Sequence, residues 1–127
     1  MHKLLIIDDD LALTSLLTDY FSAQQFDVEV ANSPDQGLIK LKDRDYDLLL
    51  LDVMMPVMDG FEFRLLQSQS PRISKIPVLV TTGDTDSSIS KRMMYPMKIE
   101  HKPLQITPLL ESITQCLSGE QPSSIQL

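Results

Sequence analysis

The chain has 127 residues, of which 43% are apolar and 23% are charged, and its formal net charge is −7. This length and composition fit one soluble globular domain whose core needs no disulfide or structural metal. No apolar run approaches the roughly 20 residues of a membrane span, and the N-terminus lacks a signal peptide's long apolar segment. The acidic balance argues against a nucleic-acid surface, and the single cysteine, Cys116, excludes an internal disulfide and suits a reducing cytoplasm.

The first elements alternate between strand and helix patterns. Residues 3–7 form a short apolar run that ends at acids, which predicts a buried strand. A helix is expected next, because one apolar stripe follows at helical spacing: Leu13, Leu16, Leu17, Tyr20 and Phe21. Residues 27–31 then alternate between polar and apolar side chains and predict a second strand.

The middle of the chain continues this alternation. Ser33 is the expected N-cap of a helix reaching about residue 44, with proline at its first position and Gln36 completing a capping box. Residues 46–51 are the strongest candidate for a buried strand. Asp59 offers a second cap, for a helix that should end near residues 70–71.

The last third of the chain predicts two strands and two helices. Residues 76–81 are a continuous apolar strand, and residues 97–101 alternate like a half-buried or edge strand. Between them, residues 86–94 predict a short helix. Thr107 is the expected cap of the last helix, with Pro108 at its first position. We expect a domain over residues 1–118 and a polar tail or start of a linker over residues 119–127.

Five strands alternating with five helices predict an α/β fold with a parallel sheet covered on both faces. Ligands of such sheets bind at the carboxyl ends of the strands. The residues expected at those ends come from four strands: Asp8, Asp9, Asp10, Asp52, Thr81, Thr82, Gly83 and Lys102. Clustered carboxylates repel one another, and a hard cation such as Mg²⁺ relieves this repulsion. A carboxylate, a cation, an ammonium and a hydroxyl together suit phosphoryl transfer.

These residues and their order resemble the receiver domains of two-component response regulators, over residues 3–117. The most specific stretch is residues 51–60, LDVMMPVMDG, supported by the acids after the first strand, the threonines after the fourth and the Lys102–Pro103 pair. The resemblance implies a flavodoxin-like, doubly wound (βα)5 fold with strand order 2-1-3-4-5. It also implies a signalling domain that catalyses its own phosphorylation and slow dephosphorylation, rather than an enzyme acting on a free metabolite.

The resemblance implies one role for each matching residue. Asp52 is similar to the phosphoacceptor, and Thr82 and Lys102 are similar to the residues that contact the phosphoryl group. The implied ligands of Mg²⁺, with Mn²⁺ as an alternative, are the following: Asp8, Asp9, Asp52 and the backbone carbonyl of Met54. The Lys102–Pro103 peptide bond is expected to be cis.

The implied partner is a histidine kinase or a histidine phosphotransfer protein in the cytoplasm. The resemblance leaves the downstream partner and a homodimer open, and it predicts no direct contact of this chain with nucleic acid or a membrane. The chain is expected to be either a stand-alone receiver or a piece of a longer regulator.

Two positions near Lys102 depart from the family pattern. Ile99 stands where receivers usually carry a switch aromatic, and Glu100 replaces a residue that is commonly apolar. These differences lie in the region that receivers use to contact partners.

Other functions and simpler structural roles compete with this hypothesis. An aspartate-dependent phosphatase usually has an acid two residues after its nucleophile, where this chain has Met54. A nucleotide or flavin binder would place a phosphate where Asp8 to Asp10 would repel it. A pseudo-receiver without phosphorylation remains a third alternative. Asp10 alone fits a helix cap, and the acids together fit a helix start favoured by the dipole.

Overall fold

A five-stranded parallel sheet lies between two layers of helices in the computed structural model, which describes residues 1–54, 60–83 and 98–119. The strands are β1 (Lys3–Ile7), β2 (Asp27–Ala31), β3 (Leu48–Asp52), β4 (Val78–Thr82) and β5 (Lys98–His101). Their order is β2-β1-β3-β4-β5, and each neighbouring pair is parallel. The predicted fold class and strand order are therefore confirmed.

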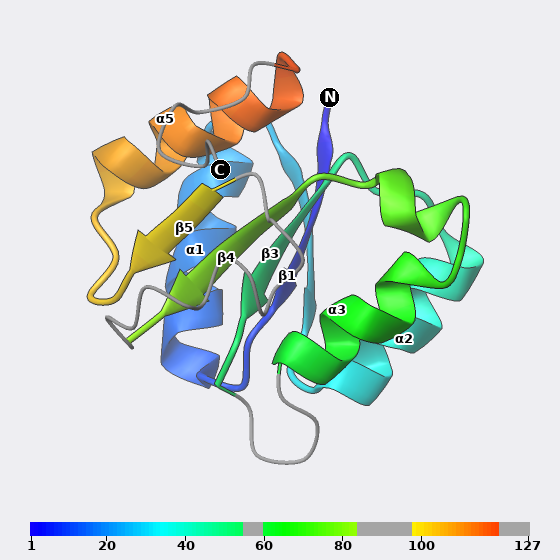
Figure 1. Ribbon diagram of the computed structural model, residues 1–127. Helices are drawn as coiled ribbons and strands as arrows, with labels where there is room; N and C mark the ends of the chain where they lie inside the picture. Colours follow the sequence, from blue (N-terminus) through cyan, green and yellow to red (C-terminus); the bar gives the residue numbers. More distant parts are fainter. Residues whose placement is uncertain (55–59, 84–97, 120–127) are drawn as a thin grey trace.

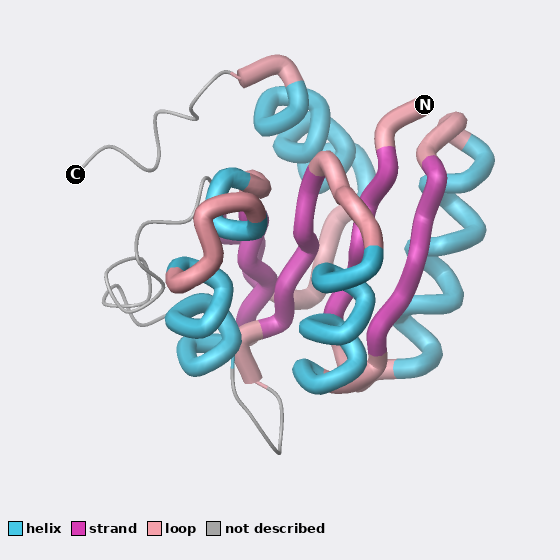
Figure 2. The backbone as a smooth tube through the Cα atoms, turned by 90° about the vertical axis from the view of Figure 1, so that its right-hand side faces the viewer, coloured by secondary structure: helices cyan, strands magenta, loops and turns pink. Residues whose placement is uncertain are grey.

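The helices cover both faces of the sheet (Figures 1 and 2). They are α1 (Leu11–Ala23), α2 (Pro34–Asp43), α3 (Gly60–Ser68) and α5 (Ile106–Leu117), with a short 3-10 helix, η1, at Ile73–Lys75. Helices α1 and α5 lie on one face, and α2 and α3 lie on the other. None of the helices in the described ranges has the length and apolar character to cross a membrane.

The central strands β1, β3 and β4 are mostly apolar because both faces of the sheet are covered there, whereas the edge strands β2 and β5 alternate apolar with polar or charged residues. Successive residues point to opposite faces, so each strand contributes to two cores. The core on the α2 and α3 side contains Leu5, Ile7, Leu49, Leu51, Val80 and Phe63. The core on the α1 and α5 side contains Leu4, Ile6, Leu48, Leu50, Leu79, Phe21, Leu109 and Ile113.

The start of α2 confirms the predicted cap. The Ser33 hydroxyl accepts a hydrogen bond from the Gln36 amide at 3.2 Å, and proline occupies the first helical position. The Gln36 side chain reaches back to accept from the Asn32 amide at 3.1 Å, one residue before the cap rather than at it. The first bond satisfies a backbone donor that a helix start leaves without an intrahelical partner, and the second fixes the residue before the cap against the first turn.

The predicted start of the last helix was wrong by two residues. Helix α5 begins at Ile106 with Gln105 at the cap position, so Thr107 lies inside the helix. Pro108 then sits in the first turn, where a missing N–H costs no intrahelical bond.

One predicted member of the α1 stripe does not face the core. Leu16 is 59% exposed, and the buried position in that turn belongs to Thr14. The Thr14 hydroxyl donates to the Leu11 carbonyl at 3.2 Å, which lets a polar side chain occupy the helix's inner face.

Three further predictions concern the middle of the chain. Helix α3 ends at Ser68, earlier than expected, and η1 was not predicted. The Asp59 cap and the helix at residues 86–94 lie outside the described residues. Strand β5 is an edge strand in the described sheet, as its alternation indicated.

Glu29 on the outer strand β2 connects three elements through one carboxylate. It accepts hydrogen bonds from Arg44 at 2.7 Å and from the Tyr46 hydroxyl at 3.0 Å, and Lys3 Nζ lies 3.2 Å away. Burial raises the pKa of this carboxyl, but its hydrogen bonds to Arg44, Tyr46 and Lys3 outweigh burial and lower the pKa to about 2. The ionised form is therefore the one that the fold stabilises.

Acidification should remove this contribution to stability. The pKa of Glu29 is about 2 in the fold against an ordinary 4.5, so the stabilisation is complete above pH 4.5 and is lost as the pH falls towards 2. Glu29→Gln carries no charge at any pH, so this variant should lose less free energy of unfolding than the wild type between about pH 5 and about pH 3. Urea unfolding followed by circular dichroism measures the difference.

Glu111→Gln makes the same chemical change at an exposed position of α5 and should follow the wild type. Equal losses in the wild type and in Glu29→Gln would contradict the role assigned to the Glu29 carboxylate.

Candidate functional site

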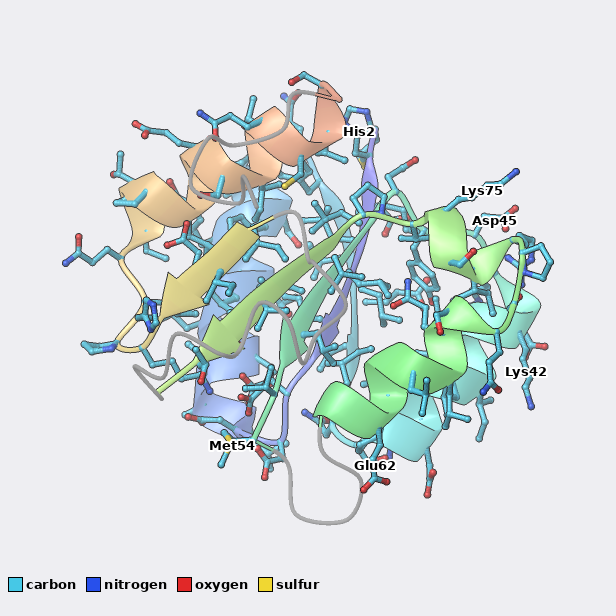
Figure 3. The ribbon with its side chains drawn as sticks, in the orientation of Figure 1. His2, Lys42, Asp45, Met54, Glu62 and Lys75 are labelled. Atoms are coloured by element: carbon cyan, nitrogen blue, oxygen red, sulfur yellow. The ribbon has the colours of Figure 1, made fainter. Side chains whose placement is uncertain are left out.

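The carboxyl ends of the strands gather polar side chains at one rim of the sheet. Asp8 directly follows β1, Asp52 is the last residue of β3, and Lys102 directly follows β5. Met54 lies at this rim, whereas His2 lies at the opposite end of the sheet (Figure 3). The parallel arrangement thus brings together residues that are far apart in the sequence, as predicted.

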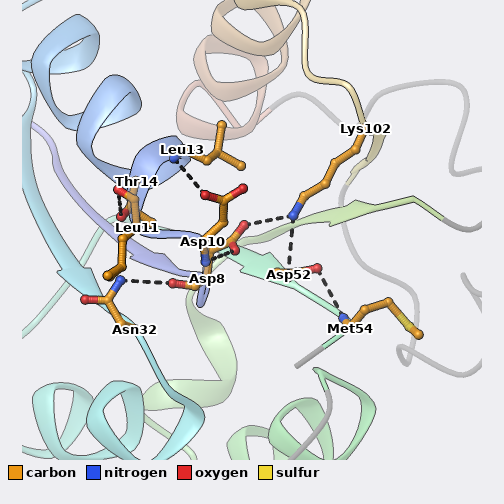
Figure 4. Close-up of polar contacts among 9 residues, drawn as sticks. All are labelled: Asp8, Asp10, Leu11, Leu13, Thr14, Asn32, Asp52, Met54 and Lys102. Carbon is orange, nitrogen blue, oxygen red and sulfur yellow. Dashed lines mark hydrogen bonds and ion pairs between the residues drawn. The ribbon is translucent and has the colours of Figure 1, made fainter. Parts of the chain in front are cut away.

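Two buried carboxylates share one ammonium group at the centre of the rim (Figure 4). Lys102 Nζ lies 3.1 Å from Asp8 Oδ2 and 3.5 Å from Asp52 Oδ2. Asp8 and Asp52 are each only 3% exposed. Burying two neighbouring negative charges is costly unless a cation compensates them, and Lys102 supplies that compensation in this structure.

Backbone and amide contacts fix the position of Asp8. Its Oδ1 accepts from the Asp10 amide at 2.9 Å, and its own amide donates to the Ala31 carbonyl at 3.1 Å. Asn32 Nδ2 donates to the Asp8 carbonyl at 3.1 Å. The sequence analysis missed Asn32, although its place directly after β2 puts it at the same rim.

Asp52 has a carboxyl whose protonation is sensitive to this environment. Burial raises its pKa and is the largest influence. The Met54 amide, which donates to Asp52 Oδ1 at 3.1 Å, lowers the pKa. The charge of Asp8 raises the pKa further, and Lys102 lowers it. The net result is a pKa of about 6 instead of 3.8. Asp52 is therefore mostly ionised at neutral pH but is close to protonation.

Lys102 keeps its proton despite partial burial. Burial lowers the pKa of the ammonium, but the hydrogen bond to Asp8 and the charge of Asp52 outweigh it and raise the pKa above its ordinary value. The site thus holds a permanent positive charge next to Asp52. The Lys102–Pro103 peptide bond is cis, as predicted.

Three carboxylates are placed to hold a cation. Oxygens of Asp8, Asp9 and Asp52 lie within 4.8 Å of one another, and Asp9 is exposed. These oxygen donors are the type that Mg²⁺ and Mn²⁺ prefer, so the donor set fits such an ion.

An open pocket of about 500 Å³ lies over this rim and gives a small anion access to it. Its lining residues are Asp9, Asp10, Asp52, Met54, Gly83 and Lys102. Met54, predicted to offer a backbone carbonyl, is 60% exposed.

The remaining predicted residues lie at the same rim. Thr82 ends β4 and is fully buried, and its carbonyl accepts from the Lys102 amide at 2.7 Å. Thr81 is also buried and pairs with Asp52 across the strands. Asp10 is the N-cap of α1, where its Oδ1 accepts from the Leu13 amide at 3.1 Å, which confirms its expected role as a cap.

Comparison with protein families identifies one match over most of the chain. The family model described as "Response regulator receiver domain" matches residues 4–114. Among curated proteins, the chain is similar to a "Transcriptional regulatory protein CpxR homolog" of Haemophilus influenzae, with 43% identity over 83 residues. That segment is 65% of this chain and 35% of the relative.

Two further curated relatives show the same pattern of partial coverage. A "Probable transcriptional regulator ycf29" of Pyropia yezoensis is 29% identical over 94% of this chain and 54% of its own length. "Transcriptional regulatory protein CpxR" of Escherichia coli (strain K12) is 48% identical over 49% of this chain and 26% of its own length. The chain therefore spans about half or less of the length of these relatives.

Solved structures share the fold at lower identity. The chemotaxis protein CheY4 of Vibrio cholerae is 24% identical, with a TM-score of 0.86, and the alignment covers 91% of this chain and 98% of that chain. A putative response regulator from Chloroflexus aurantiacus is 25% identical with a TM-score of 0.85, and the alignment covers 92% of this chain and 98% of that chain.

The titration of Asp52 tests the electrostatics of the rim. In the metal-free protein, the 13Cγ chemical shift of Asp52 should change with a midpoint near a pKa of about 6. Asp8→Asn removes a repelling charge and should lower this midpoint, whereas Lys102→Ala removes an attracting charge and should raise it. A wild-type midpoint near the ordinary 3.8, or shifts of the same sign in both variants, would contradict the arrangement described.

Proposed function

Because the chain belongs to the family of response regulator receiver domains, we propose that it accepts a phosphoryl group on Asp52 in a Mg²⁺-dependent reaction. The donor would be a histidine kinase or a histidine phosphotransfer protein, and the modified domain would change conformation to control a partner or output domain. The observation that carries this proposal is the Lys102 ammonium held between Asp8 and Asp52 beside an open pocket.

The chemistry uses the ionised carboxylate of Asp52 as a nucleophile. One Asp52 oxygen attacks the phosphorus of the donor phosphohistidine, and the P–N bond breaks. The bonding electrons return to the imidazole nitrogen, which takes up a proton. The product is an acyl phosphate on Asp52, and the donor histidine is regenerated.

The other residues neutralise and orient the incoming group. Lys102 gives up part of its contact with Asp52 and pairs with a phosphoryl oxygen. The Thr82 hydroxyl donates to a second phosphoryl oxygen. Such positioning and charge compensation supply most of the catalysis in phosphoryl transfer. Because the pKa of Asp52 is about 6, the nucleophile is mostly ionised at neutral pH without a separate base.

The ligands proposed for Mg²⁺ are Asp8, Asp9, Asp52 and the backbone carbonyl of Met54, and Mn²⁺ has the same donor preference. When bound, the ion supplies positive charge that offsets the repulsion between these carboxylates and the phosphoryl oxygens. The domain catalyses its own phosphorylation and slow dephosphorylation, so it is a signalling domain rather than an enzyme acting on a free metabolite.

We assign the receiver domain to residues 1–118 and a tail or the start of a linker to residues 119–127. We expect the protein to act in the cytoplasm. The curated relatives are named as transcriptional regulators and are longer than the matched segment. We propose that this chain takes part in regulation through a protein partner or output domain, as a monomer or homodimer, without itself contacting nucleic acid or a membrane.

Incubation with Mg²⁺ and acetyl phosphate, followed by intact-mass spectrometry, tests the proposed function. The wild-type protein should gain the mass of one phosphoryl group. Asp52→Ala should gain none, because it lacks the nucleophile, and a chelator should prevent the gain in the wild type.

Asp45→Ala removes an exposed carboxylate far from the rim (Figure 3) and serves as the matched control, which should be modified like the wild type. A gain of mass in Asp52→Ala equal to that of the wild type would refute Asp52 as the acceptor.

A further inference from the structure

A side-chain hydrogen bond connects β5 to α5 close to the candidate site. The Ser112 hydroxyl donates to the Glu100 carboxylate. Ser112 is 4% exposed, and Glu100 is partly buried on the edge strand. Neither residue belongs to the rim, and Glu100 occupies a position where receivers commonly carry an apolar side chain.

Strand β5 is held on both of its faces by consecutive residues. Ile99 packs against the apolar core on the α2 and α3 side. Adjacent side chains of a strand point to opposite faces, and Glu100 accordingly reaches α5 on the other side. Within the described sheet, β5 pairs with β4 alone, so these two contacts supplement a single backbone ladder.

The bond spans the segment that carries Lys102. Only residues 102–105 separate β5 from α5, so Glu100 and Ser112 lie on either side of this connection. Helix α5 is itself fixed to the sheet by Leu109 and Ile113, which are fully buried. The Glu100–Ser112 bond therefore restrains the end of β5 relative to α5.

We infer that Glu100 and Ser112 are positioning residues that hold the Lys102 ammonium in place between Asp8 and Asp52. The inference rests on the proposed function, because its effect on phosphorylation is exerted through Lys102. The required feature is the hydrogen bond and not the charge of Glu100, because this bond fixes the backbone two residues before Lys102, on a strand that pairs with Thr81.

The effect should appear as slower phosphoryl acceptance. Ser112→Ala removes the donor and leaves a partly exposed carboxylate that water can solvate. This variant should accept phosphoryl from acetyl phosphate about fivefold more slowly, because small displacements of a charged group in a site reduce rates strongly. Glu100→Ala should be slowed similarly, whereas Glu100→Gln keeps an acceptor oxygen and should stay within about twofold of the wild type.

Thr114→Ala is the matched control. It also removes one hydroxyl from α5, but the Thr114 hydroxyl donates only within its own helix, to the Leu110 carbonyl at 2.9 Å. Its rate should equal that of the wild type. A Thr114→Ala rate reduced as much as that of Ser112→Ala would assign the effect to general weakening of α5 and overturn the inference.

A double-mutant cycle separates positioning from a merely structural role. In a Lys102→Ala background, Ser112→Ala should slow the residual reaction no further, because the residue on which it acts is absent. An equal slowing in both backgrounds would overturn the inference, and so would a wild-type rate in Ser112→Ala.

Amide hydrogen exchange gives a measurement that does not depend on phosphorylation. The Lys102 amide, which donates to the Thr82 carbonyl, should exchange about fivefold faster in Ser112→Ala, while the Ile6 amide in β1 should be unchanged. Unchanged exchange at Lys102 would overturn the inference even if the Lys102→Ala rate is too low to measure. A wild-type protein that accepts no phosphoryl group would instead refute the proposed function. The exchange rate of the Lys102 amide would then be the test of whether the Glu100–Ser112 bond positions Lys102.

Discussion

The electrostatic balance between two buried carboxylates and one ammonium governs the organisation of this domain's rim. Asp8 and Asp52 come from adjacent parallel strands, and Lys102, which contacts both carboxylates, offsets the electrostatic repulsion between them. Asp52 retains a pKa of about 6 in the presence of the ammonium, because burial is the largest influence on it and the charge of Asp8 adds to the increase. Three carboxylates face one ammonium, and this donor set fits a further cation, with Asp9 exposed to solvent.

The parallel topology is what allows such a rim to form. The central strands β1, β3 and β4 run through the core with buried apolar side chains on both faces, and their buried polar residues lie at or directly after their carboxyl ends. Because all five strands point the same way, these polar residues emerge at one end, and strand order decides which become neighbours. Asp8 and Asp52 meet because β1 and β3 are adjacent, while Lys102 reaches them from the far side of β4 through its long side chain.

The sequence predicted the strands and the rim well because both follow from simple periodicity. The apolar run before Asp8 and the run before Asp52 are short and end at acids, which is typical of buried strands, so their ends were predictable to about two residues. The contacts that depend on three-dimensional packing were missed. Asn32 donates to the Asp8 backbone carbonyl, and Glu29 pairs with Lys3 of β1 and with Arg44 at the end of α2. Neither set of contacts has a sequence pattern. The start of α5 was misplaced because a proline is tolerated at several first-turn positions.

Strand β5 shows how an edge strand can carry a functional residue without losing precision. An edge strand has a neighbour on one side only, so its end would be the least constrained part of the described sheet. Here Ile99 secures one face in the core, and Glu100 secures the other on α5. The Glu100–Ser112 contact connects the strand that precedes Lys102 to α5. If the ammonium moves to meet a new anion on Asp52, the displacement acts on a strand that contacts α5 and can reach that helix through the Glu100–Ser112 bond.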